Sequence, residues 1–167
     1  MKKCTMIALD TSTTITGYAI YFNGVLNKHN IIDLSNYNDS IYRTKQMKLR
    51  IIQLLKDLEP DIVVIEANRN NNNVKTVRLL SSIMGVVEGY CLTYDIYYEE
   101  LPPSQWRKYV KDNEILPTHR DDLKKWSIDK VTNMGISIQT DDESDAILLG
   151  QALINYYDTL EKKYDNK

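Results

Sequence analysis

The chain has 167 residues, of which 43% are hydrophobic and 26% charged, a balance that excludes a disordered chain and fits one ordinary folded domain. No stretch of about eighteen apolar residues occurs, so the sequence predicts no membrane span. The net charge of -2 is uninformative about nucleic-acid partners, because acids can gather at a metal site and bases elsewhere. We expect one domain over residues 1–160 and a frayed charged tail over 161–167.

The cysteine and histidine content argues against a zinc site and against a disulfide framework. Cys4 and Cys91 have no partners at metal-ligand spacing, and His29 and His119 are the two histidines of the chain. We interpret both cysteines as buried, reduced thiols. The apolar segment near the N-terminus is too short for a signal-peptide core, so we expect a cytosolic protein.

The first 34 residues predict three antiparallel strands. Residues 5–9 are apolar and end at Asp10, and residues 16–22 are a second strand-like segment. The Asn-Gly pair that follows is a strong hairpin signal, and a returning strand is predicted over 25–34.

The next segment predicts a crossover through a helix. Apolar residues recur at helical spacing after Asp39 or Ser40, either of which can cap the helix, and Pro60 ends it. Residues 61–66 are then a β-branched run typical of a buried strand, ending at Glu66. Because a helix joins this strand to the earlier ones, we expect it to run parallel to the first strand.

The second half predicts more helices and one more strand. A polar, asparagine-rich loop is followed by a predicted helix over 74–94, a strand over 96–100 and a helical turn over 104–110. A further helix is predicted over 118–134, where Thr118 and Asp121 have the spacing of a capping box, and a last helix starts near Asp141. The predicted fold is α/β, a mixed five-stranded sheet flanked by helices. Its first three strands are antiparallel, and the fourth and fifth run parallel to the first.

Four acids fall where this sheet would bring them together. Asp10 and Glu66 end two strands that we expect to be neighbours, and Asp142 and Asp145 are three residues apart on one face of the last helix. Carboxylates this close repel one another unless divalent cations neutralise them, and oxygen ligands favour Mg²⁺ or Mn²⁺. Two such ions about 4 Å apart can drive phosphodiester hydrolysis without a histidine, serine or cysteine nucleophile.

Each acid also has a structural interpretation. Asp10, before Thr11, could be a turn former, and Glu66 could be an exposed charge at a strand end. Asp141, Asp142 and Glu143 could be residues favoured by the dipole at a helix start. The joint occurrence of the four acids in this order favours the metal site.

Three motifs carry a resemblance to a known family. The opening motif is Ile7-Ala8-Leu9-Asp10-Thr11-Ser12-Thr13-Thr14-Ile15-Thr16-Gly17-Tyr18-Ala19, the second is Val63-Val64-Ile65-Glu66, and the last is Asp142-Glu143-Ser144-Asp145-Ala146 before an apolar helix. Together they resemble the motifs of RuvC-type Holliday junction resolvases over roughly residues 5–157. The length resembles the compact phage-encoded members, such as those of lactococcal bacteriophages, which implies work in the cytoplasm of a bacterial host.

The resemblance implies an RNase H-like fold, a homodimer, and Mg²⁺-dependent nicking of branched DNA such as four-way junctions and forks. It places the metal-binding, catalytic acids at Asp10, Glu66, Asp142 and Asp145, with Asp141 as a competitor for the third position. It also matches Gly17 to a glycine of the second strand, where a missing side chain would let the DNA backbone approach.

One position departs from the family pattern. The cellular bacterial resolvases carry an aromatic residue three positions after the second acid, where this chain has Arg69. Arginine can stack or bind phosphate, but it offers a different surface. We therefore expect selection of branched DNA by shape, with weak sequence preference at the cut.

Basic residues are the candidate DNA contacts, and a solvated helix face is the alternative for them. The candidates are Arg69, Lys75, Arg107, Lys108, Arg120 and Lys124. Trp106 and Trp126 are more typical of packing than of base stacking. The helix over 74–94, with small residues and an apolar stripe, is the candidate dimer interface.

Other functions remain open. The strand followed by Asp-Thr-Ser-Thr also resembles the first phosphate motif of actin-like ATPases, although this chain lacks their further glycine-rich loops. A catalytically silent DNA-binding module is a third possibility. Ribonuclease H shares the acidic geometry, but the last motif and the basic segment after Ser104 favour the resolvase. The sequence leaves open the preferred branched substrate, including flaps, and any branch-migration partner.

Overall fold

The computed structural model describes residues 4–67 and 73–165, and its centre is a five-stranded mixed sheet. The strands are β1 (Thr5–Asp10), β2 (Ile15–Phe22), β3 (Val25–Asp33), β4 (Ile62–Glu66) and β5 (Tyr97–Leu101), in the order β3-β2-β1-β4-β5. Strands β1, β2 and β3 pair antiparallel, while β4 runs parallel to β1 and to β5. The predicted strand directions are confirmed.

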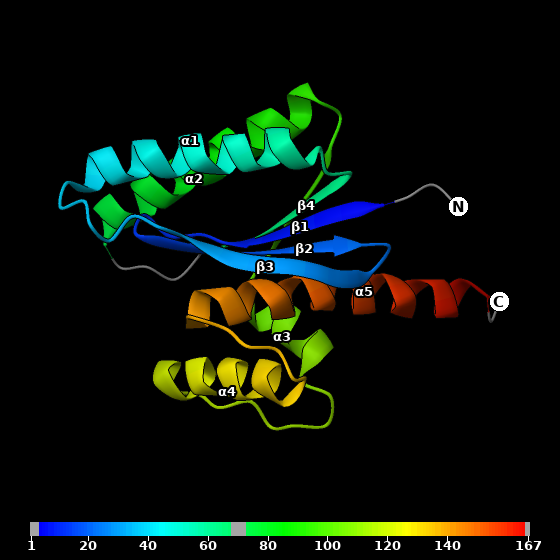
Figure 1. Cartoon of the computed structure of the whole chain (residues 1–167). Helices are drawn as coiled ribbons and strands as arrows, with labels where there is room; N and C mark the ends of the chain where they lie inside the picture. Colours follow the sequence, from blue (N-terminus) through cyan, green and yellow to red (C-terminus); the bar gives the residue numbers. More distant parts are fainter. Residues whose placement is uncertain (1–3, 68–72, 166–167) are drawn as a thin grey trace.

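Helices cover both faces of the sheet (Figure 1). One face carries α1 (Ser40–Leu58) and α2 (Val74–Thr93), and the other carries α3 (Pro103–Val110), α4 (Arg120–Asn133) and α5 (Asp141–Asp165). Helix α5 packs directly on the sheet, and α4 packs on the outer side of α5. Within residues 4–67 and 73–165, no helix has the length and apolar character needed to cross a bilayer.

The ends of the helices test the capping signals and the tail boundary predicted from the sequence. Of the two predicted caps of α1, Asp39 is the one that the structure shows, and its side chain accepts a hydrogen bond from the backbone N–H of Tyr42. The predicted capping box of Thr118 and Asp121 is wrong, because α4 begins at Arg120 and no side chain caps it. Helix α5 continues to Asp165, through part of the segment where we expected a frayed tail.

Alternation along the strands separates two cores and decides where the acids point. Ile7 and Leu9 of β1 belong to the core beneath α1 and α2, whereas Met6 and Ala8 belong to the core beneath α5. Successive side chains of a strand point to opposite faces, so Asp10 falls on the α5 side. The same alternation in β4 carries Glu66 to the α5 side, because Val64 faces that core. The two strand-end acids therefore share one face of the sheet.

Candidate active site

The four predicted acids line one cavity of about 500 Å³ between the sheet edge, α4 and the start of α5. Asp141 lines it as well, so the competing acid is also present. The remaining lining residues are Thr11, Ser12, Pro103, Arg107, Thr118, Arg120, Leu123 and Lys124. A larger cavity of about 630 Å³ lies away from these acids, between the α3–α4 loop and α4.

Asp10 and Glu66 emerge side by side because of the strand register. Leu9 of β1 pairs with Ile65 of the parallel strand β4, and each acid is the next residue along. The hydroxyl of Ser12 accepts hydrogen bonds from the N–H groups of Thr14 and Ile15, at 3.1 and 2.9 Å. Ser12 therefore closes the turn after β1, which leaves the carboxylate of Asp10 for the cavity.

Glu66 is held by a tryptophan for which the sequence favoured packing over base stacking. Trp106 is fully buried, and its Nε1 donates a hydrogen bond of 2.7 Å to Oε2 of Glu66. The guanidinium of Arg107 lies 4.7 Å from the centroid of the same indole, and its Nη2 is 3.6 Å from Oδ2 of Asp145. Helix α3 thus fixes one acid and brings a positive charge to another.

Gly17 allows the start of α5 to lie against the sheet. A Cβ added at Gly17 would lie 2.0 Å from the carbonyl oxygen of Asp142 and 2.7 Å from the backbone nitrogen of Glu143. The space beside this glycine is filled by protein backbone, so our interpretation of it as an approach for DNA is wrong. In β2, Gly17 pairs with Asp10, which places the first turn of α5 directly over that acid.

Burial and mutual repulsion raise the pKa of every acid of the predicted set. Burial, followed by the charges of Glu66 and Asp145, raises the pKa of Asp10 well above its usual range. Burial and Asp145 raise the pKa of Glu66 to about 7, although the Trp106 hydrogen bond lowers it. Burial and Asp141 raise the pKa of Asp142 to about 6. Burial also raises the pKa of Asp145, against the opposing effects of Ser127 and Arg107.

The donor set fits a hard divalent cation by its chemistry. Among the described residues, Oδ1 of Asp145 is buried without a hydrogen-bond partner, and so is the hydroxyl of Thr11. As they stand, no three acids, histidines or cysteines of the described residues are close enough to enclose an ion. A divalent cation held by these acids would give the unpaired oxygen of Asp145 a partner and offset the repulsion that raises the pKa values.

The candidate basic residues separate into two groups. Arg107, Arg120 and Lys124 line the cavity, and Nζ of Lys124 forms an ion pair with Asp141. Lys75 at the start of α2 and Lys108 on α3 are exposed and do not line it. Arg69 lies outside the described residues.

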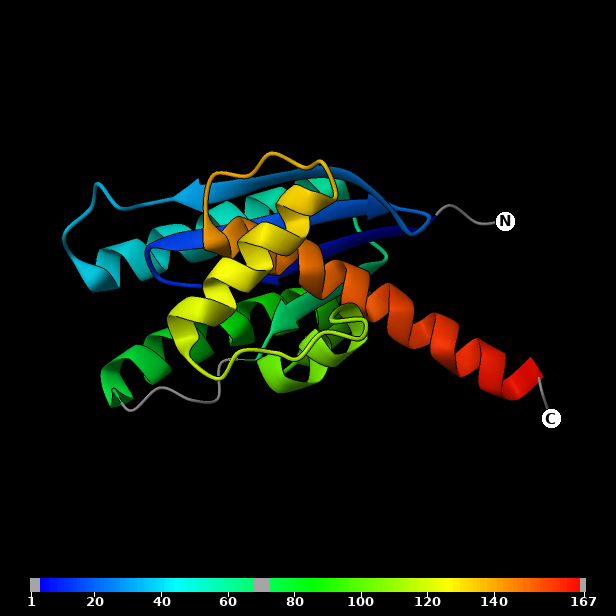
Figure 2. The same ribbon diagram turned by 90° about the horizontal axis from the view of Figure 1, so that it is seen from below.

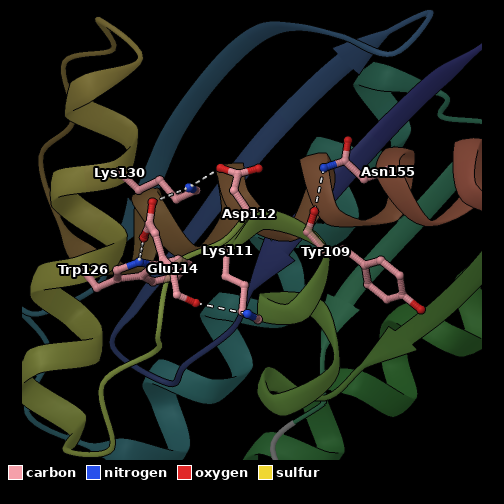
Figure 3. Close-up of polar contacts among 7 residues, drawn as sticks. All are labelled: Tyr109, Lys111, Asp112, Glu114, Trp126, Lys130 and Asn155. Atoms are coloured by element: carbon pink, nitrogen blue, oxygen red, sulfur yellow. Dashed lines mark hydrogen bonds and ion pairs between the residues drawn. The ribbon is translucent and has the colours of Figure 1, made fainter.

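Helix α4, which carries two of these bases, is tied to the α3–α4 loop by a separate network (Figure 3). Nζ of Lys130 donates to Asp112 at 2.8 Å and to Glu114 at 3.1 Å, and Nε1 of Trp126 donates to Glu114. Figure 2 shows α4 lying across the first turns of α5, the helix that carries Asp142 and Asp145. The network therefore fixes the helix that closes the cavity.

No family model and no curated protein matches this sequence. Solved structures do match. The Thermus thermophilus RuvC in complex with a Holliday junction substrate aligns with a TM-score of 0.69 at 11% identity, covering 93% of this chain and 96% of that one. The yeast mitochondrial Holliday junction resolvase Ydc2 aligns with a TM-score of 0.64 at 14% identity, over 94% and 80% of the two chains. The Fowlpox virus resolvase bound to its Holliday junction substrate aligns with a TM-score of 0.54 at 18% identity, over 95% and 97%. These likenesses confirm the predicted RNase H-like fold.

Proposed function

We propose that this protein is a metal-dependent endonuclease that cuts branched DNA, with the Holliday junction as its main substrate. The observation that carries the proposal is the convergence of Asp10, Glu66, Asp142 and Asp145 on one cavity. The fold adds support, because three proteins named as Holliday junction resolvases or RuvC share it over nearly the whole chain. Forks and flaps are the further substrates that we propose for it.

The four carboxylates would hold two Mg²⁺ ions, or Mn²⁺ in their place. When bound, the ions would activate water and stabilise the leaving oxygen during phosphodiester hydrolysis. The protein's own residues orient the reacting groups. Trp106 holds Glu66 in place through its N–H, and Arg107, Arg120 and Lys124 offer positive charge for phosphate oxygens at the cavity wall. The unpaired hydroxyl of Thr11 is a further donor for a phosphate oxygen.

A homodimer suits this substrate, because symmetrical cutting of a four-way junction needs two active sites related by a two-fold axis. The exposed side of α2 is the interface that we propose for this dimer. Ser81, Gly85 and Gly89 are exposed at four-residue intervals, and nothing lies within 4 Å of a Cβ added at either glycine. Small residues in such a row let a second helix approach closely. This face lies across the sheet from α5 (Figure 1).

Asp10→Asn tests the function directly. We expect this variant to lose Mg²⁺-dependent nicking of a synthetic four-way junction while it still binds the junction in a mobility-shift assay. Asp57→Asn, which removes an exposed acid from α1 on the other face of the sheet, is the matched control and should cut normally. Retained nicking in Asp10→Asn would contradict the assignment. Junction binding without cutting by the wild type would favour a silent binding module, and ATP binding would favour an actin-like ATPase.

The expectation of shape selection is tested with mobile junctions. Cut sites of the wild type are mapped along a junction core that can migrate through many sequences. We expect cuts at many positions with weak preference, because Arg69 stands where the cellular bacterial resolvases carry an aromatic residue. A single dominant tetranucleotide would contradict this expectation.

A further inference from the structure

The first turn of α5 contains a buried acid that faces away from the cavity. Glu143 is 1% exposed and is absent from the residues that line the cavity, although it lies beside Asp142 in the chain. Its Oε1 is 2.6 Å from Nδ1 of His29 on β3, and its Oε2 accepts a hydrogen bond of 2.6 Å from the backbone N–H of Gln139. Both carboxylate oxygens are therefore paired, which is what a buried acid requires.

The same turn is held at further points. The backbone N–H of Glu143 donates to the hydroxyl of Thr140 at 3.2 Å, so Thr140 and Glu143 form a close variant of a capping box. The side chain of Gln139 donates to Asn30 on β3 at 3.1 Å. On the β2 side, Gly17 admits the backbone of the turn without a gap. The edge of the sheet, and not the cavity itself, thus sets where α5 begins.

This anchoring has a consequence for the acids. Asp142 and Asp145 project from the anchored turn toward Asp10 and Glu66. When ionised, all four carboxylates are negatively charged, so they repel one another and tend to move apart in the absence of a cation. An opposing contact on the far side of the helix turn resists that spreading. Glu143 and His29 are placed to supply it, because their contact joins the turn to a strand that carries none of the four acids.

We propose that the contact between His29 and Glu143, here termed the His29–Glu143 clamp, positions Asp142 and Asp145 for metal binding. The inference rests on the proposed function, since it assumes that these acids bind a divalent cation. His29 and Glu143 are positioning residues, because neither lines the cavity. The clamp acts through the backbone of one helix turn, which is short enough to transmit a shift of its anchor to the two acids.

The test measures Mn²⁺ binding to the full chain by calorimetry, without DNA. We expect His29→Ala to raise the Mn²⁺ dissociation constant by about three- to tenfold, less than the 10–100-fold typical of groups that touch a metal ligand directly. His29→Asn, whose Nδ2 can take the place of Nδ1, should restore most of the affinity. Asn27→Ala, an exposed neighbour on β3, is the matched control and should bind like the wild type. The Mn²⁺ concentration that gives half-maximal nicking should shift in parallel, with the rate at saturating Mn²⁺ little changed.

A purely structural role would look different. A His29→Ala variant that melts earlier but binds Mn²⁺ with wild-type affinity would overturn the inference, and so would a His29→Asn variant as weak as His29→Ala. If His29→Ala does not fold, Glu143→Gln replaces it in the test, because glutamine weakens the contact with His29 and fills the same volume as glutamate. We expect a smaller loss of affinity in the same direction, and unchanged affinity would overturn the inference. Failure of the wild type to bind Mn²⁺ would instead overturn the proposed function, and the inference with it.

Discussion

Replacing Gly17 by alanine should move the first turn of α5 and disable the site. The added Cβ would lie 2.0 Å from the carbonyl oxygen of Asp142, while ordinary contacts begin at 3.4 Å, so the turn must retreat by about 1.4 Å. Overpacking of this kind costs about 1–3 kcal/mol of stability. A misplacement of about 1 Å can reduce a rate about 100-fold, and Asp142 moves with the turn. We therefore expect Gly17→Ala to be both less stable and almost inactive.

Urea denaturation and the nicking rate on a four-way junction measure the two effects. Gly89→Ala is the matched control, because nothing lies within 4 Å of its added Cβ and alanine favours a helix by about 1 kcal/mol over glycine. It should be as stable as the wild type or more so. Because Gly89 lies on the proposed dimer face, this variant is a control for stability alone, and Asp57→Asn is the control for the nicking rate. A Gly17→Ala protein with wild-type stability and rate would refute the reasoning that this glycine exists to admit α5.

Three further predictions follow from the site and the helix faces. The first concerns pH. Burial raises the pKa of Glu66 to about 7 and that of Asp142 to about 6, so the folded state keeps protons that the unfolded chain releases at lower pH. The metal-free protein should therefore lose stability as pH rises from about 4.5 to 7. Glu66 alone accounts for up to about 3 kcal/mol of this loss, which urea denaturation at a series of pH values measures. Saturating Mg²⁺ at pH 8 should restore the lost stability. A stability that rises with pH over this range would contradict the burial of the acids. Trp106→Phe removes the donor that lowers the pKa of Glu66, so the acidic limb of the pH–rate profile should move to higher pH, and an unmoved limb would show that this hydrogen bond does not tune the acid. Gly85→Arg places a bulky charge on the open face of α2 and should turn a dimer into a folded monomer in light scattering; a variant that stays dimeric would exclude this face as the interface.

The sequence predicted the elements well where the signal is local. The Asn-Gly hairpin, the cap at Asp39 and the end of α1 before Pro60 all depend on residues within a few positions of one another. The failed capping box at Thr118 shows the limit, because a capping pattern recurs by chance and the chain before α4 follows another path. The true capping pair of α5, Thr140 and Glu143, carries a visible Thr-x-x-Glu signal that we did not single out.

The sequence alone determined which residues are acidic, which of them end strands, and that Asp142 and Asp145 share a helix face. Strand alternation then places Asp10 and Glu66 on the same side of the sheet. Only the tertiary structure decided what supports these acids, since the partners lie far away along the chain: Trp106 beside Glu66, and His29 beside Glu143. It also reversed the meaning of Gly17, because a missing side chain looks the same in a sequence whether DNA or the protein's own helix fills the space.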